Sequence, residues 1–184
     1  MRVDELRKNF DLQIGWTAFP LHPDTPEEGL SLEKMYADRG IDLTQATARL
    51  RRVADELGLP LGERTRTFNS RLAQELAKWA ELKGRGHEYH RAVFRAYFVE
   101  GRNIGKADEL LALVASMGLP REEAVSVLRE RPFKGTVDSD WNRCHEMGIT
   151  AVPTFVMNQQ AVVGAQPYDV LERFLFAQGM KKKQ

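Results

Sequence analysis

The segment 148-GITAVPTFVMNQQAVVG-164 constrains the fold more than any other part of the sequence. Two apolar runs, residues 154–157 and 161–163, flank the polar residues 158–160, and this pattern predicts a β-hairpin. Pro153 stands directly before the first run. Because proline has no N–H to give to a sheet ladder, it is expected at the first residue of a strand or on an edge. From these residues alone, Pro153 is read as a trans proline that starts the strand, since cis X-Pro bonds are uncommon.

A further strand is predicted near the N-terminus, after a helix that ends at about residue 10. Leu12, Ile14, Trp16 and Ala18 alternate with polar or small residues, which favours a strand over residues 12–19. Pro20 ends this strand, and the loop over residues 22–29 follows.

From about residue 31 to residue 131 the spacing of apolar residues is helical. The predicted helices cover residues 32–39, 44–57, 70–82, 87–100, 107–117 and 121–131, and two more follow at 140–147 and from 166 onward. Their expected first residues or N-caps are Ser31, Thr44, Asn69 or Ser70, Pro120, and Asp138 or Ser139. The helices between the strands are therefore interpreted as an inserted subdomain.

Composition excludes several classes of function. The chain has 184 residues and a net charge of +1, which gives no basic surface for nucleic acid. It holds neither an apolar run of membrane-spanning length nor an N-terminal hydrophobic signal region, so we expect no membrane partner and a cytoplasmic location.

Three sets of residues could carry chemistry, namely the cysteine, two histidines and a group of aromatic residues, but each is better explained by a structural role. Cys144 is the single cysteine, and it is expected to be a partly buried packing residue beside Trp141. His87 and His90 share a helix face, but without a third ligand they are expected to lie on a solvated face, and no metal site is predicted. The aromatic residues of the same helix are expected in the core, although some could line a substrate groove.

Several motifs resemble one family of proteins when they are read together. The hairpin segment Gly-Ile-Thr-Ala-Val-Pro-Thr-Phe-Val resembles the C-terminal half of the DsbA-like thioredoxin-fold family. The segments 16-WTAFPLHPDTPEEG-29, Phe68-Asn69-Ser70 and 97-YFVEGRNIGKADELLALVASMGL-119 are similar to its cytoplasmic FrnE-like branch. That branch also contains the 2-hydroxychromene-2-carboxylate isomerases and the kappa glutathione transferases.

This resemblance implies an α/β, thioredoxin-like fold with an all-helical insertion. The thioredoxin-like domain would take residues 1–30 and 136–184, and the insertion residues 31–135. The resemblance also implies that the Val152-Pro153 bond is cis and that Val152, Pro153 and Thr154 bind the substrate. The partner would be a thiol or disulfide peptide, or glutathione, added along a strand edge.

The family's first strand and its Cys-x-x-Cys motif have no counterpart in these residues, so no catalytic residue is assigned. We expect a thiol-disulfide oxidoreductase-like protein that is inactive alone, from a gene with a shortened annotated start. The alternatives are a non-catalytic module that binds peptide or glutathione, and a relative of the glutathione-dependent isomerases and transferases. Because the family's first strand is central in the sheet, we expect its neighbours to have open edges that self-association covers.

Overall fold

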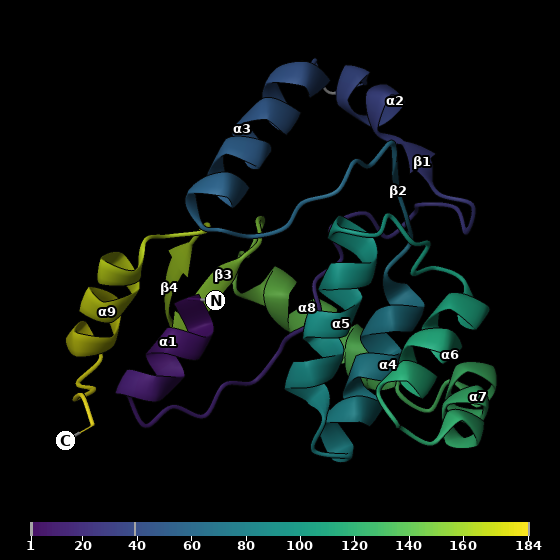
Figure 1. Ribbon diagram of the computed structural model, residues 1–184. Helices are drawn as coiled ribbons and strands as arrows, with labels where there is room; N and C mark the ends of the chain where they lie inside the picture. The colour runs from purple at the N-terminus through teal and green to yellow at the C-terminus, as the bar shows by residue number, and fades with distance from the viewer. Residues whose placement is uncertain (1, 39, 184) are drawn as a thin grey trace. The chain divides into compact units, whose positions relative to one another are not determined.

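The computed structural model of the chain describes residues 2–38 and 40–183. Figure 1 shows the helices α1 (Arg2–Asn9), α2 (Leu32–Ala37), α3 (Leu43–Glu56), α4 (Arg71–Leu82), α5 (Gly86–Phe98), α6 (Ala107–Ser116), α7 (Arg121–Glu130), α8 (Lys134–Glu146) and α9 (Tyr168–Ala177). Its strands are β1 (Leu30–Ser31), β2 (Arg66–Thr67), β3 (Thr154–Met157) and β4 (Gln160–Val163). The described residues are thus mostly helical, with few and short strands.

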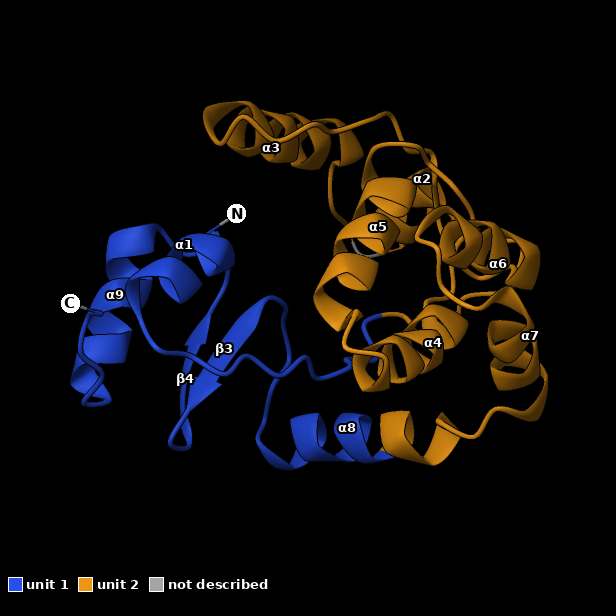
Figure 2. Ribbon diagram, turned by 60° about the horizontal axis from the view of Figure 1, so that its bottom comes forward, with its two compact units in different colours: residues 1–21, 139–184 blue, residues 22–138 orange. Residues whose placement is uncertain are grey.

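The chain forms two compact units, which are coloured separately in Figure 2. The first contains Met1–Leu21 and Ser139–Gln184, and the second is His22–Asp138. Compactness alone does not test whether a segment folds independently, so the domain boundaries given above stay a prediction.

The predicted hairpin is confirmed in the first unit. β3 pairs antiparallel with β4, and the register joins Thr154 to Val163 and Met157 to Gln160. The two turn residues, Asn158 and Gln159, have φ of 48° and 64°. Positive φ at both central residues is the geometry whose twist matches that of the flanking strands.

One face of this hairpin packs on α1 and α9. Their buried side chains are Leu6, Leu171 and Leu175, joined by Phe10, which directly follows α1. Partly buried residues of the hairpin pack against these four, namely Phe155, Met157 and Val162. The alternation of side chains along a strand therefore leaves Thr154 and Val156 on the opposite face.

The predicted strand over residues 12–19 is wrong. Residues 11–20 belong to no ladder in the described part of the chain. The N–H of Ala18 instead donates to the Asp140 carboxylate at 2.8 Å, and its carbonyl accepts from the Cys144 thiol at 3.6 Å. Alternating apolar residues favour a strand only where a partner strand exists, and here side chains of α8 supply the hydrogen bonds.

The second unit has a helical core formed by α4, α5, α6 and α7. Tyr89, Leu76 and Val114 are completely buried in it. A two-residue ladder, β1 with β2, was not predicted, because two residues are too few to show a period. Gly29 precedes β1 with φ of 80°, and a Cβ there would lie 2.5 Å from the Thr67 carbonyl oxygen.

The helix starts agree only in part with the sequence. Ser31 caps α2 as predicted, since its hydroxyl accepts from the Lys34 N–H at 3.4 Å. Asp42, and not Thr44, caps α3. The predicted start of α8 at Asp138 or Ser139 is also wrong: the helix begins at Lys134, and the Asp138 carboxylate pairs with Arg71 at 2.7 Å instead of capping.

None of the helices in the described ranges is both long and apolar enough to span a bilayer.

Candidate functional site

The peptide bond between Val152 and Pro153 is cis, as the resemblance implied. Two contacts fix the residues around it. The Pro153 carbonyl accepts from the Gly164 N–H at 2.7 Å, which extends the hairpin by one rung. The Thr154 hydroxyl donates to the Ala151 carbonyl at 2.6 Å and so joins the residues before and after the bond.

The main chain of Val152 has no hydrogen-bond partner among the described residues. The residue Val152 is 44% exposed, and among the described residues no hydrogen bond reaches the Val152 N–H or C=O. Pro153 has no N–H and therefore cannot compete for an acceptor at this point. Val152 thus presents one donor and one acceptor beside the start of β3, which is what an extended peptide needs for pairing.

The only thiol of the sequence is not placed for chemistry. Cys144 lies in α8, is 4% exposed, and its Sγ contacts the Ala18 carbonyl, so the predicted burial is confirmed. Burial raises the pKa of the Cys144 thiol, and the nearby Asp140 charge raises it further, while Arg143 opposes them. Since the thiolate is the nucleophilic form, Cys144 is a poor nucleophile.

The two histidines of α5 do not gather a ligand set. The Nε2 of His90 lies 3.5 Å from one carboxylate oxygen of Glu81. Within residues 2–38 and 40–183, no group of three or more His, Cys, Asp or Glu side chains could hold a metal ion.

The aromatic residues of α5 divide between core and surface. Tyr89 is completely buried, and burial raises the pKa of its hydroxyl. Phe94 is 42% exposed and therefore departs from the predicted core. The ring of Tyr97 lies 4.4 Å from the Arg64 guanidinium, and its hydroxyl is 2.9 Å from the Thr67 hydroxyl.

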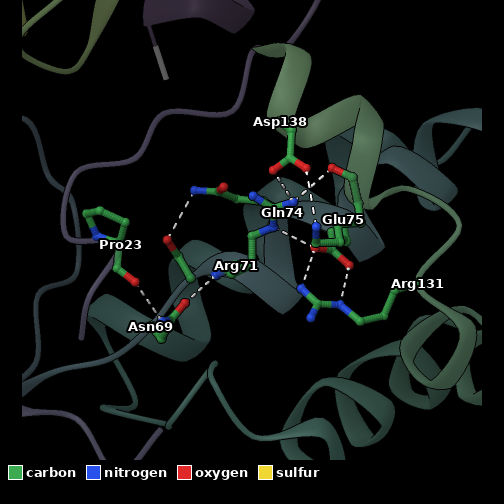
Figure 3. Close-up of polar contacts among 9 residues, drawn as sticks. Pro23, Asn69, Arg71, Gln74, Glu75, Arg131 and Asp138 are labelled. Atoms are coloured by element: carbon green, nitrogen blue, oxygen red, sulfur yellow. Dashed lines mark hydrogen bonds and ion pairs between the residues drawn. The ribbon is translucent and has the colours of Figure 1, made fainter. Parts of the chain in front are cut away.

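The sequence does not predict an ionic cluster that forms around the buried Glu75 in the second unit. Figure 3 shows this Glu75 cluster, formed by Arg71, Glu75, Arg131 and Asp138. The Arg71 guanidinium joins the two acids, with Nε 2.5 Å from Glu75 Oε1 and Nη2 2.7 Å from Asp138 Oδ1. The available signal was a glutamate four residues after an arginine on the apolar side of a helix.

Asn69 fixes the loop that precedes β1 to the start of α4. Its Nδ2 donates to the Pro23 carbonyl at 3.1 Å, and its Oδ1 accepts from the Arg71 N–H at 2.9 Å (Figure 3). Its Nδ2 also donates to the Thr25 carbonyl at 2.8 Å. All three of these hydrogen bonds join the Asn69 side-chain amide to backbone groups. Asn69 therefore acts as a structural residue in this unit.

Comparison with known proteins gives one consistent result. The family model described as "DSBA-like thioredoxin domain" matches residues 1–176. The "Uncharacterized protein YwbO" of Bacillus subtilis (strain 168) is 28% identical over 180 residues, which are 97% of this chain and 88% of that protein.

Two solved structures are also similar. The "probable DsbA oxidoreductase SCO1869 from Streptomyces coelicolor" matches with a TM-score of 0.79 and 26% identity, over 89% of this chain and 74% of that one. A 2-hydroxychromene-2-carboxylate isomerase matches with a TM-score of 0.74 and 21% identity, over 97% of this chain and 85% of that one. The latter likeness shows the fold alone.

Proposed function

Because the chain belongs to the DSBA-like thioredoxin domain family, we propose that it binds an extended thiol or disulfide peptide, or glutathione, through the main chain of Val152. The observation that carries this proposal is the exposed residue Val152, whose backbone N–H donates to no partner and whose C=O accepts from none among the described residues. Peptides and glutathione share the chemistry that such a site recognises, an extended chain with amide donors and acceptors.

Thr154 and Pro153 support the same role. The Thr154 hydroxyl is engaged by the Ala151 carbonyl, so it shapes the turn into β3 and does not point a free donor at the ligand. Pro153 keeps its carbonyl in the hairpin and has no N–H. A ligand strand would therefore find its main-chain partners at Val152, before the first residue of β3.

Disulfide turnover is not part of the proposal for these 184 residues. A dithiol oxidoreductase needs one thiolate to attack and a second thiol to resolve the mixed disulfide. The sequence contains one cysteine, and that thiol is buried. An oxidoreductase activity would need a Cys-x-x-Cys pair that these residues do not contain.

Glutathione-dependent isomerisation or transfer is the alternative, and it shares the first step, which is binding of glutathione. A glutathione titration therefore tests the first step of both proposals. Conversion of an aromatic substrate after glutathione has bound would favour the alternative over a binding module without activity.

Two substitutions at Val152 test the docking role. Val152→Ala keeps both main-chain groups, whereas Val152→Pro removes the N–H. Since that N–H has no partner in residues 2–38 and 40–183, its loss removes no hydrogen bond that the structure describes. One hydrogen bond contributes about 1 kcal/mol, so Val152→Pro should weaken binding about fivefold or more while Val152→Ala changes it little.

The measurement is calorimetric titration of the purified chain with reduced glutathione and, separately, with a short unstructured cysteine peptide. Binding of either probe with the expected difference between the two variants supports the proposal, and the two arms identify the ligand class. Absence of binding for both probes, or equal binding to both variants, overturns it. Reduction of insulin by this chain would contradict the expectation that these 184 residues do not turn over disulfides.

A further inference from the structure

The Arg64 guanidinium lies against two aromatic rings at the C-terminal end of α5. Its Cζ is 4.4 Å from the centroid of the Tyr97 ring and 4.9 Å from the centroid of the Phe98 ring. The two ring centroids are 4.7 Å apart, and the ring planes are nearly perpendicular, at 84°. Cation–π attraction to both rings therefore holds the guanidinium in a corner that two adjacent residues of one helix form.

The main chain that carries Arg64 is fixed on both sides of this residue. Before it, the Gly62 N–H donates to the Phe98 carbonyl at 2.9 Å, and a Cβ at Gly62 would collide with the carbonyl of the residue after Phe98. After it, the Thr65 carbonyl accepts from the Leu32 N–H at 2.9 Å. Backbone contacts thus place Arg64 beside α5 without the help of an ion pair.

The charge of Arg64 has no anionic partner in the part of the chain that the structure describes. Arg64 is half-buried, and within that part no hydrogen bond or ion pair reaches its guanidinium. Glu63, the acid beside it in the sequence, lies 3.9 Å from Arg51. Glu100, the first acid after α5, pairs with Arg95 at 2.9 Å. Since a charge that is partly removed from water is costly without a counter-charge, an external anion would stabilise Arg64.

Arg66, two residues further along the chain, has a different environment. Its Nε and Nη2 donate to the carbonyls of Glu28 and Gly29 at 3.1 and 2.8 Å, and so hold the loop that precedes β1. Arg64 makes no such contact and keeps its N–H donors for a ligand. A guanidinium that stacks on aromatic rings presents these donors as a rigid planar fork, which fits two oxygens of one anion.

We propose that Arg64 binds the carboxylate of a small organic acid or of a peptide C-terminus. One guanidinium supplies one positive charge, which one carboxylate balances, whereas a phosphate group carries up to about two negative charges at neutral pH and calls for a second cation. Phe98 extends the surface to Phe94, whose ring centroid is 6.2 Å away and which is 42% exposed. The ligand would therefore carry an apolar group next to its carboxylate.

This site is independent of the function proposed above. Arg64 belongs to the second unit, and Val152 belongs to the first. Binding of a carboxylate at Arg64 needs neither a thiol nor an extended main chain, so a ligand that lacks both tests Arg64 by itself. Val152→Pro should consequently leave the affinity of such a ligand unchanged.

Two matched ligands test the inference in the unmodified full chain. N-acetylleucine and N-acetylleucinamide differ only in the carboxylate, and NMR titration should show at least about tenfold tighter binding of the acid. The amide shifts should centre on residues 62–66 and 97–99. A pentapeptide that ends in leucine, with a free or an amidated C-terminus, separates the two sources: tighter binding of the free peptide than of N-acetylleucine identifies a chain end, and the reverse identifies a small acid.

Three variants assign the binding to the guanidinium and to its aromatic contacts. Arg64→Gln should weaken binding of the acid by at least about tenfold. Arg91→Gln is the control, since Arg91 is an exposed arginine of the same helix, and it should leave binding unchanged. Phe98→Leu keeps an apolar side chain but removes one ring, and it should also weaken binding. Equal binding of the acid and its amide, equal losses in Arg64→Gln and Arg91→Gln, or inorganic phosphate that binds as tightly as the acid would each overturn the proposal.

Discussion

Arg131 donates to both carboxylate oxygens of Glu75, from Nε to Oε2 at 3.0 Å and from Nη2 to Oε1 at 2.7 Å. The Glu75 side chain is 1% exposed, and Arg131 follows the last residue of α7 with φ of 52°. A left-handed conformation is uncommon for a residue other than glycine. The paired hydrogen bonds to a buried acid offset this cost and attach the end of α7 to α4.

Replacement of Glu75 by glutamine should lower the free energy of unfolding by about 3 kcal/mol, because it leaves two arginines beside a buried site without their counter-charge. Urea denaturation followed by circular dichroism measures the change. Glu130→Gln is the matched control, since Glu130 and its partner Arg129 are 61% and 71% exposed, and it should cost less than about 0.5 kcal/mol. Equal effects of the two substitutions would contradict the structural role of the Glu75 cluster.

The same carboxylate should make stability depend on acid. Burial by itself would raise the pKa of Glu75, but the hydrogen bonds from Arg131 and Arg71 outweigh it and hold that pKa below the ordinary 4.5. The contribution of Glu75 is therefore complete above about pH 4.5 and is lost as the pH falls through the lower, folded-state value. The difference in unfolding free energy between the unmodified chain and Glu75→Gln should shrink between about pH 5.5 and about pH 3. A difference that stays constant over this range would show that Glu75 does not titrate in the predicted direction.

The Cys144 thiol should react slowly while the protein is folded. Burial raises the pKa of this thiol and limits access to it, so both the thiolate fraction and the rate of attack fall. The reaction with Ellman's reagent at neutral pH should be at least about a hundredfold slower in the native protein than in urea. Comparable rates in the two conditions would mean that Cys144 is accessible and that its exclusion as a nucleophile is wrong.

Two glycine-to-alanine substitutions should have effects of opposite sign. A Cβ at Gly62 would lie 2.0 Å from the Val99 carbonyl oxygen, so Gly62→Ala forces the backbone apart and should destabilise the second unit by about 2 kcal/mol. Gly135 lies within α8, and a Cβ added there would meet no atom within 4 Å, so Gly135→Ala should stabilise the protein by about 0.5–1 kcal/mol. Thermal unfolding of both variants checks the prediction, which fails if the midpoints move in the same direction.

The sequence predicted elements whose determinants are local. The hairpin at residues 154–163 follows from its apolar runs and turn residues, and the Ser31 cap follows from a single side chain. The prediction of a strand over residues 12–19 was wrong because a strand depends on a partner strand, which a local pattern does not contain. The local sequence predicts a helix cap at Asp138, but its carboxylate pairs with Arg71, whose position 67 residues earlier a local pattern does not contain.

The candidate site was predictable only through family resemblance. Nothing in the spacing of residues 148–164 distinguishes a cis from a trans bond at Val152-Pro153, and from the residues alone the trans form was the simpler interpretation. The exposure of Val152 and the lack of a hydrogen-bond partner for its main chain among the described residues are properties of three-dimensional structure. The Glu75 cluster likewise depends on Arg131, which is separated from Glu75 by 56 residues.

The most direct test of the central claim is an NMR titration of the 15N-labelled chain with reduced glutathione and with a cysteine peptide. The account predicts that the largest amide shifts fall at Val152 and Thr154 and that they follow a single binding curve. Shifts that instead centre on another part of the chain, such as His87 and His90 in α5, or no shifts with either probe, would contradict it.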